Sequence, residues 1–354
     1  IQSSGGWTFG SPSVLMMFYR APGELESELA EMDECMPHYY RVTNRHGQGA
    51  ETIMRAEALF YQGHVTDAHI ELERAYAQVG GNGQINMALC CDFLSWRLSL
   101  HTDVERRYTF SERYAALLRY HDASWINIWS ATSAYYHALR GETDKIPEIF
   151  SQHRLSDIHL LAPGKPMMEM IENQVYLAQG AYAKVVVRSA ELLAACEAMH
   201  YALVALHIRI QTAAAYARLG KPETAHTWLQ KALSDAGPDG LVMPFAENYS
   251  ILKPLLARET RSAFAARITA LGEAAQARGA ERLRPAAFRA LTAREFEIVE
   301  LMVQRLSNRE IAQKCYLSEG SVKQYVNQIY SKLHIEGDTR TKRAQLAALL
   351  HEKT

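Results

Sequence analysis

The chain has 354 residues, of which 48% are hydrophobic and 22% are charged, and its formal net charge is −1. This length exceeds the usual size of one compact domain, and the apolar content is ample for a sizeable core, so two folded parts are predicted. No apolar run approaches the ~18 residues of a membrane span and no secretory leader is present, which excludes a membrane partner and predicts a cytoplasmic protein. The chain begins with Ile1 rather than Met, which indicates a fragment of something longer.

Charge is distributed unevenly along the chain. Residues 281–354 hold 13 Lys and Arg against 9 Asp and Glu, whereas residues 1–280 hold 25 against 30. The formal net charge is therefore about +4 for the C-terminal part and about −5 for the body. This asymmetry predicts a polyanionic partner for the C-terminal part.

The cysteines are odd in number and show neither a CxxC pair nor a Cys/His metal-binding spacing. That pattern predicts reduced thiols and no metal site. The five residues are Cys35, Cys90, Cys91, Cys196 and Cys315.

Glycine-centred helix breaks recur along the body of the chain, at Gly63, Gly141, Gly180 and Gly220, with intervals of 78, 39 and 40 residues. The interval of 78 residues predicts a further helix break near Thr102, in "SLHTDVERR", where no glycine is present. Each glycine can take the left-handed conformation that ends a helix. A period near 39 with two amphipathic helices in each unit predicts a helical solenoid, and the units resemble tetratricopeptide repeats with a longer period than the usual 34.

The predicted fold class is all-α, with a tetratricopeptide-like solenoid of helical hairpins followed by a small C-terminal domain, for which the family resemblance of residues 291–350 implies a helix-turn-helix fold of four helices. Four segments follow from this interpretation. They are a partly helical lead-in from an upstream region (1–48), the solenoid as a sensor or interaction domain (49–256), a helix and linker (257–290) and a DNA-binding domain (291–354).

The C-terminal segment has three clear helix starts. Thr292 with Glu295, and Ser307 with Glu310, each form a capping box, in which hydroxyl and carboxylate satisfy exposed backbone amides. Ser318 is placed to cap a third helix over residues 318–333. The second and third helices, with a tight polar break between them, read as a helix-turn-helix pair.

The third helix has two distinct faces. Val322, Val326, Ile329 and Leu333 recur with helical spacing and are predicted to be buried. Three strong donors share the opposite side, and they have the chemistry to read bases because Lys can donate to guanine while Gln and Asn can pair with adenine. These are Lys323, Gln324 and Asn327. Spacing by itself leaves open the alternative that they are only the solvated face of a surface helix.

The stretch 291–350 resembles the LuxR-type helix-turn-helix domain, since "LTAREFEIV", "LSNREIAQK", "LSEGSVKQYVNQIYSKL" and "RAQLAALL" match its segments in order. The resemblance implies that the three donors face bases and that a last helix, over 341–350, pairs with another protomer. It also implies a set of residues near the DNA backbone: Ser307, Asn308, Ser318, Ser321, Tyr325 and Lys332. Two positions depart from the family, which commonly has Gly where this chain has Arg305 and His334.

The body, a solenoid of tetratricopeptide-like hairpins followed by "GLVMPF" and then a LuxR-type domain, is similar to the C-terminal part of the large ATP-binding LuxR-family regulators, the MalT-like class. "GSPSVL" and "MDECMPHYYRVTNRHGQGAE" also resemble their middle region. The resemblance implies promoter DNA, RNA polymerase and a small-molecule or protein inducer as partners, with self-association on DNA. ATP is expected only for a missing upstream domain, because the chain has no GxxxxGKS or GxxxxGKT motif and "PGKP" and "LGKP" read as turns. No cofactor is therefore expected in this chain.

Aromatic residues on the inferred first helices are the weak candidates for an inducer site, although aromatics at helical spacing are more often core. They are Trp96, Trp125, Trp129 and Tyr135. No Ser/His/Asp, Cys/His or metal spacing predicts catalysis, so an enzyme is not expected. The predicted function is a sequence-specific transcription regulator, an activator, and the alternative is a protein-interaction scaffold whose helix-turn-helix domain has lost or minor DNA-binding activity.

Overall fold

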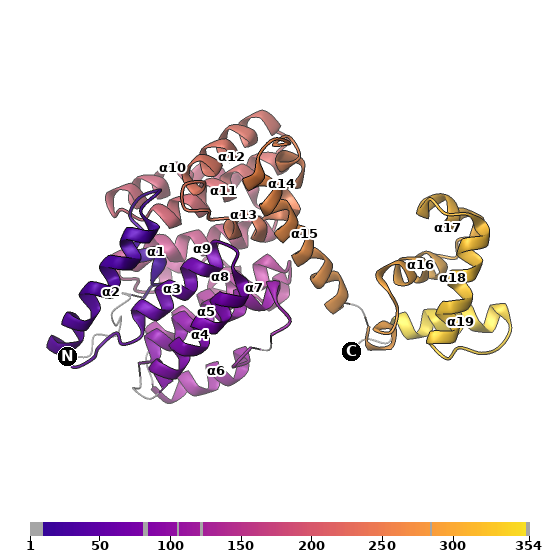
Figure 1. Ribbon diagram of the computed structural model, residues 1–354, viewed down its shortest axis with the longest axis horizontal. Helices are drawn as coiled ribbons and strands as arrows, with labels where there is room; N and C mark the ends of the chain where they lie inside the picture. Colours follow the sequence, from indigo (N-terminus) through magenta and orange to yellow (C-terminus); the bar gives the residue numbers. More distant parts are fainter. Residues whose placement is uncertain (1–9, 81–83, 105, 121–122, 284, 352–354) are drawn as a thin grey trace. The chain divides into compact units, whose positions relative to one another are not determined.

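The structure is a computed structural model that describes residues 10–80, 84–104, 106–120, 123–283 and 285–351. Every element in these ranges is helical and none is a strand, which confirms the predicted all-α class. The chain divides into two compact units, Ile1–Ala275 and Gln276–Thr354 (Figure 1). The division falls within α15 (Ala263–Leu283), inside the predicted helix-and-linker segment 257–290.

The first unit, called unit 1 below, consists of helices of four to eighteen residues joined by short connections. Its helices are α1 (Leu15–Phe18), α2 (Leu25–Val42), α3 (Ala50–Tyr61), α4 (Val65–Gly80), α5 (Ile85–His101), α6 (Phe110–Leu117), α7 (Ala123–Leu139), α8 (Glu148–Ser151), α9 (Lys165–Ala178), α10 (Tyr182–Ala198), α11 (Ala202–Arg218), α12 (Pro222–Ala236), α13 (Met243–Glu247), α14 (Tyr249–Leu256) and the first half of α15. Short 3-10 turns lie at η1 (Leu118–Tyr120), η2 (Thr143–Lys145), η3 (Leu155–Asp157) and η4 (Ala162–Gly164).

The long helices of unit 1 pack mainly on their neighbours in chain order, from α3 and α4 through α5, α7 and α9 to α12. The predicted helix-ending glycines have the required conformation, with φ of 82° at Gly63, 69° at Gly141, 78° at Gly180 and 71° at Gly220. The expected break without a glycine is also present, because α5 ends in an extended Thr102 with φ of −134°. The recurring helix breaks read from the sequence are therefore confirmed.

The array of hairpins closes on itself, which the sequence did not predict. Helix α1 packs on both α3 and α11, and α13 does the same, so two short helices bridge the early and late hairpins. Val14, Leu15 and Met16 are fully buried there, and a Glu57 carboxylate oxygen on α3 accepts a hydrogen bond from the Leu15 N–H at 2.7 Å. The described part of the predicted lead-in thus belongs to unit 1, with residues 11–16 buried in its core, while its first nine residues lie outside the described residues.

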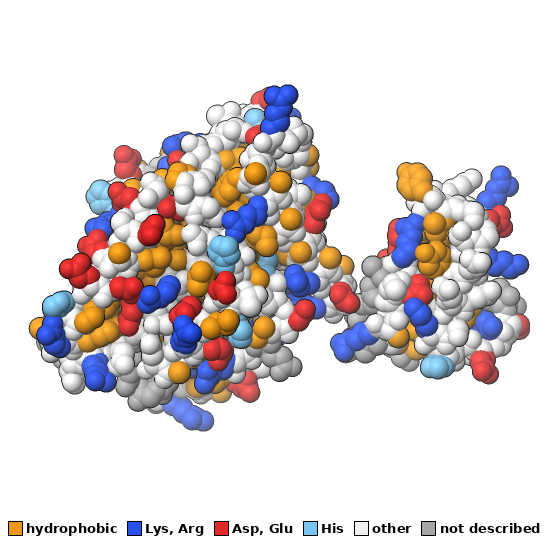
Figure 2. Space-filling model, in the orientation of Figure 1, with side chains coloured by type: hydrophobic (Ala, Val, Ile, Leu, Met, Phe, Trp, Pro, Cys, Tyr) orange, Lys and Arg blue, Asp and Glu red, His pale blue; other side chains and the backbone are white. Residues whose placement is uncertain are grey.

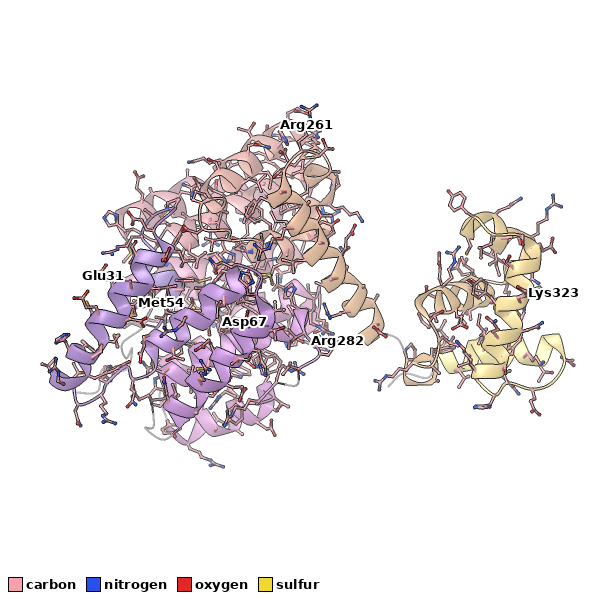
Figure 3. The ribbon with its side chains drawn as sticks, in the orientation of Figure 1. Glu31, Met54, Asp67, Arg261, Arg282 and Lys323 are labelled. Carbon is pink, nitrogen blue, oxygen red and sulfur yellow. The ribbon has the colours of Figure 1, made fainter. Side chains whose placement is uncertain are left out.

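Helix α2 lies at an edge of unit 1 and carries a strongly acidic sequence, "LESELAEMDECMPHYYRV". Acidic side chains gather along it on the face shown in Figure 2. Glu31 lies on its outer side (Figure 3). Leu25, Met32 and Met36 are on the buried side, so the helix is amphipathic and packs on α3 through its apolar stripe.

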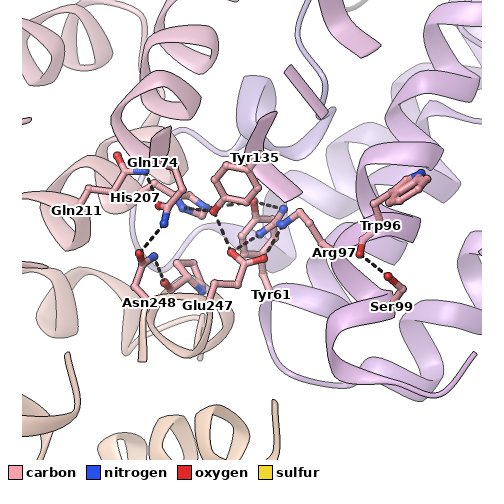
Figure 4. A network of polar contacts seen from close by, with 11 residues as sticks. Tyr61, Trp96, Arg97, Ser99, Tyr135, Gln174, His207, Gln211, Glu247 and Asn248 are labelled. Atoms are coloured by element: carbon pink, nitrogen blue, oxygen red, sulfur yellow. Dashed lines mark hydrogen bonds and ion pairs between the residues drawn. The ribbon is translucent and has the colours of Figure 1, made fainter. Parts of the chain in front are cut away.

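A polar network fills the interior where the hairpins meet (Figure 4). The Arg97 guanidinium donates to both carboxylate oxygens of Glu247, at 2.7 and 3.0 Å, and to the Tyr61 hydroxyl at 2.8 Å. The Tyr135 hydroxyl donates to the Glu247 carboxylate at 3.0 Å, and both tyrosines contact the His207 ring. The charged side chains are 1% and 0% exposed, so the bidentate geometry is what offsets the cost of burying the two charges.

Aromatic rings, a neutral histidine and a chain of amide hydrogen bonds surround this ion pair. The Arg97 guanidinium lies over the rings of Phe60, Tyr61 and Phe93 at 4.7, 4.7 and 5.1 Å from their centroids, a favourable arrangement for a desolvated cation. Burial, and next the Arg97 charge, hold the pKa of His207 well below its usual value, so this ring is neutral. A chain of amide hydrogen bonds continues the network towards α9 and α13 through Gln211, Gln174 and Asn248.

Candidate nucleic-acid interface

The second unit, called unit 2 below, has a small hydrophobic core of its own. After η5 (Ala286–Phe288) its helices are α16 (Ala293–Val303), α17 (Asn308–Cys315), α18 (Glu319–Lys332) and α19 (Thr339–His351). The buried side chains of this core are Phe288, Leu291, Ile298, Val299, Met302, Ile311, Ala312, Cys315, Val322, Ile329, Tyr330, Ile335 and Leu346. Helix α16 packs on α17, α18 and α19, so it is the base on which the other three rest.

Both predicted capping boxes are present. The Thr292 N–H donates to a Glu295 carboxylate oxygen at 2.7 Å, and the Glu295 N–H donates to the Thr292 hydroxyl at 3.2 Å. At the start of α17 the corresponding distances between Ser307 and Glu310 are 2.7 and 3.3 Å. The helix starts of α16 and α17 are therefore those that the sequence predicts.

The break between α17 and α18 is only three residues long. Tyr316 ends α17 in the left-handed conformation, with φ of 54°, and the Leu317 N–H donates to the Ala312 carbonyl at 2.9 Å. The Ser318 hydroxyl then caps α18 by accepting from the Ser321 N–H at 3.0 Å. An Arg294 guanidinium from α16 also donates to the Cys315 carbonyl, which fastens the end of α17. The two helices thus form a tightly defined helix-turn-helix pair.

Helix α18 is held by the face that its sequence pattern predicts. Val322 and Ile329 are fully buried, and Val326 and Leu333 are half-buried against the same core. Tyr330 is also buried, and the helical spacing did not assign it to this face. The buried stripe fixes the rotation of α18 and thereby decides which side chains face solvent.

The opposite side of α18 exposes the three predicted base-reading residues. Lys323, Gln324 and Asn327 are all exposed, and Figure 3 shows Lys323 on the side of α18 that faces away from α16. Gln328 is exposed one turn after Gln324 and extends this face, although the sequence analysis did not single it out. The signal that would have found it is its spacing of four residues from Gln324. Together these side chains present amide and ammonium groups that suit base edges in a major groove.

The predicted backbone-contacting residues divide into two groups. The hydroxyls of Ser307 and Ser318 are used as helix caps, and the Ser318 and Ser321 hydroxyls are 2.8 Å apart. Asn308 and Tyr325 are half-buried, Asn308 as the first residue of α17 and Tyr325 in the second turn of α18. The serines therefore place α17 and α18 by holding their first turns, and a contact of this group with phosphate stays a prediction.

Lys332 has a partner inside unit 2. Its ammonium donates to a Glu295 carboxylate oxygen at 2.8 Å, and the Glu295 side chain is only 3% exposed. Burial raises the pKa of the Glu295 carboxyl, but the hydrogen bonds from Lys332 and Thr292 outweigh it and hold this pKa below its usual value. Lys332 therefore fastens the end of α18 to the start of α16, a role that the prediction of a phosphate contact did not include.

The two positions where the chain departs from the LuxR-type pattern have the backbone that a glycine would favour. Arg305 has φ of 64° and His334 has φ of 53°, each directly after a helix. A non-glycine residue in this region costs on the order of 1 kcal/mol, as expected from the sequence. The helices on both sides keep their caps and core contacts, so the fold of unit 2 tolerates both substitutions.

The aromatic side chains that were candidates for an inducer site are buried or half-buried and do not form an open surface. Trp96 and Tyr135 are 4% and 0% exposed, with the Trp96 ring stacked on Phe110 and the Tyr135 hydroxyl in the buried network. Both residues therefore lie in the filled interior of unit 1, in keeping with the prediction that aromatics at helical spacing are more often core. Trp125 and Trp129 are half-buried, and the Trp129 ring nitrogen donates to the Phe110 carbonyl at 3.1 Å.

Within the described ranges, no three His, Cys, Asp or Glu side chains are grouped so that they could hold a metal ion. None of the helices in these ranges is both long and apolar enough to cross a membrane.

Comparison with known proteins identifies the C-terminal part. Residues 289–344 match the family described as "Bacterial regulatory proteins, luxR family". A stretch of 50 residues is 44% identical to "Transcriptional regulatory protein LnrK" of Bacillus subtilis (strain 168), and it covers 14% of this chain and 23% of that relative. No solved structure matches the chain. Unit 2 thus contains a LuxR-family helix-turn-helix domain, and the chain spans less than a quarter of the curated relative that it matches.

Proposed function

We propose that this chain is a sequence-specific DNA-binding transcription regulator and that α18 is its reading helix. The observation that carries the proposal is the division of α18 into a buried stripe and an exposed face with Lys323, Gln324 and Asn327. The family match over residues 289–344 supports it, as does a relative named as a transcriptional regulatory protein. A helix held in this way can lie in the roughly 12 Å wide major groove with its donors towards the base edges.

In this proposal the three residues have separate roles. The Lys323 ammonium donates to guanine O6 and N7, while the Gln324 and Asn327 amides each pair with an adenine edge. Asn308, Tyr325 and the first turns of α17 and α18 contact phosphate oxygens, which fix the register of the protein without reading sequence. A domain of this kind binds two half-sites as a dimer, and α19 is the proposed pairing helix.

Unit 1 is the proposed receiver of a signal, and the whole protein is proposed to act as an activator that works with RNA polymerase. The succession of helical hairpins supports a tetratricopeptide-like interaction unit, similar to that of the MalT-like class. We assign no catalytic step and no cofactor to this chain, and ATP enters the proposal only through a separate upstream domain.

The test is a selection of genomic DNA fragments by the full chain, followed by sequencing of the bound fragments. Wild type is compared with a triple variant, Lys323→Ala with Gln324→Ala and Asn327→Ala. Lys314→Ala, which removes an exposed lysine from α17, is the matched control. We expect one enriched motif for wild type and for Lys314→Ala, and none for the triple variant. If the triple variant enriches the same motif as wild type, α18 does not read the sequence. If no protein, wild type included, enriches a motif, the protein-interaction scaffold is favoured.

A further inference from the structure

Unit 1 has a cavity of about 350 Å³ that no role described above uses. It opens between α2, the end of α1 with the segment that follows it, and the turn between α10 and α11. Its apolar lining consists of Met17, Phe18, Met32, Met36, Tyr39 and Met199. A volume of this size falls within the range of small-molecule sites, which are mostly apolar with a few polar groups at defined positions.

Methionine dominates the wall of this cavity. Met32 and Met36 are 7% and 3% exposed and form its floor on α2, while Met17 and Met199 are half-buried on the two facing segments. Methionine side chains are unbranched and polarizable, so they adapt to irregular apolar ligands and make favourable contacts with aromatic rings. The cavity therefore suits an apolar body, especially an aromatic one, without demanding a single shape.

The walls are held together by contacts of one short segment. The Tyr19 carbonyl accepts a hydrogen bond from the Ala202 N–H at 3.1 Å, and the Tyr19 hydroxyl donates to Asp239. The next residue, Arg20, donates to Glu28 on α2 at 2.6 Å and also to Glu31. The segment after α1 is thus tied to α11 on one side and to α2 on the other, so the cavity is formed before any ligand arrives.

The rim of the cavity is acidic. Arg20, Glu28 and Glu31 are the Lys, Arg, Asp and Glu side chains that line it, so their formal charges sum to −1. Arg20 is already neutralised by its two carboxylate partners, so the lining keeps one net negative charge. A ligand with a cationic group would be attracted to this rim, whereas an anion would be repelled.

We propose that this cavity binds an amphipathic organic cation, with an aromatic or alkyl body among the methionines and a cationic head at the exposed Glu31 carboxylate. The inference rests on the proposed function only in treating such a ligand as the signal received by unit 1. Binding to the cavity itself is independent of DNA binding by unit 2, and the two can fail separately.

Cys35 provides a site-specific readout. It lines the cavity and is exposed, whereas Cys90, Cys91, Cys196 and Cys315 are buried. The full chain is treated with a maleimide, and the rate of Cys35 modification is measured with and without berberine, a planar aromatic cation that fluoresces in apolar surroundings. The anionic dye 1-anilinonaphthalene-8-sulfonate is the counter-probe. We expect berberine to slow the modification of Cys35 and the anion to have a much smaller effect.

A pair of isosteric variants tests the role of charge. Glu31→Gln removes a carboxylate at the rim, and Glu34→Gln removes an exposed carboxylate of the same helix that does not line the cavity. We expect berberine affinity to fall roughly two- to fivefold in Glu31→Gln, because an exposed pair of charges contributes modestly, and to change little in Glu34→Gln. Thermal unfolding of both variants checks that the fold is retained.

The proposal is overturned by any of three results. Protection of Cys35 by neither dye would show that the cavity is not a ligand site. Stronger protection by the anion would show that the ligand class is wrong. Equal loss of affinity in the two variants would place the cation away from the rim. DNA selection by the same protein is unaffected by each of these results, so the DNA-reading role is tested separately.

Discussion

Lys332 stands at the end of α18, and its ammonium contacts a carboxylate that is almost completely buried. Glu295 also accepts the Thr292 N–H, so one side chain both caps α16 and anchors α18. We predict that Lys332→Ala destabilises unit 2 by about 1–2 kcal/mol, because it leaves a buried carboxylate with one partner fewer. Hydrogen exchange of the α16 and α18 amides would measure this loss.

Lys314→Ala is the control for that change, since Lys314 is exposed on α17. It should alter the protection of the same amides by less than about 0.5 kcal/mol. An equal loss in the two variants would mean that the contact between Lys332 and Glu295 does not hold α18 in place.

The same pair gives a pH dependence with a defined sign. The pKa of Glu295 is lowered below its ordinary value of 4.5, since the hydrogen bonds to its charged form outweigh burial. Its contribution to stability is therefore complete above pH 4.5 and is lost as the pH falls through the lower folded-state value. We predict that the stability difference between wild type and Lys332→Ala shrinks on acidification from pH 7 to below pH 4.5. Urea unfolding at each pH measures this difference. A difference that grows on acidification would contradict this assignment.

At the scale of elements, α15 shows how a glycine permits close packing. A Cβ on Gly272 would lie 2.2 Å from the Tyr249 ring, so α15 can pack on α14 only because this position has no side chain. We predict that Gly272→Ala destabilises unit 1 by about 1–3 kcal/mol, as over-packing does in a well-packed core. Thermal unfolding measures the effect.

Gly279→Ala is the matched control within the same helix. A Cβ at Gly279 meets nothing within 4 Å, so alanine should improve the helix by about 0.5–1 kcal/mol. Opposite signs for the two variants are expected. If both stabilise the protein, the close approach of α15 and Tyr249 is not a determinant of the fold.

The elements of unit 2 were largely predictable because their signals are local. The two capping boxes lie within four residues each, and the stripe from Val322 to Leu333 lies within one helix. The contact of Lys332 with Glu295 was not predictable, since it joins residues 37 positions apart and depends on how α18 rests on α16. The same holds for the burial of Tyr330, which is decided by tertiary packing.

At the scale of the whole molecule, the principal result is the closure of the hairpin array in unit 1. The glycine period predicted the hairpins, but not that α1 and α13 would bridge α3 and α11. Trp96 and Tyr135 were weak candidates for an inducer site, and both are buried in the interior that this closure fills. Closure depends on contacts such as that of Tyr61 with His207, 146 residues apart, which no local pattern encodes.

The closure makes the buried pair of Arg97 and Glu247 important for the stability of unit 1. We predict that Glu247→Met alone destabilises unit 1 by about 3–5 kcal/mol, because it leaves the buried guanidinium without its carboxylate. The double variant with Arg97→Met should recover a large part of that loss, since two apolar side chains can replace a buried ion pair. Thermal unfolding of both variants checks this, and a double variant no more stable than the single one would show that the pair is not the dominant contact there.

In the proposed function, the exposed face of α18 reads DNA sequence. The most direct measurement is the ratio of affinities of the full chain for its selected site and for a scrambled duplex, at one fixed salt concentration. Lys323→Ala should lower affinity for the selected site by about 1–3 kcal/mol and reduce the ratio, whereas Lys314→Ala should leave the ratio unchanged. A ratio that stays the same in Lys323→Ala, or falls equally in both variants, would contradict the claim.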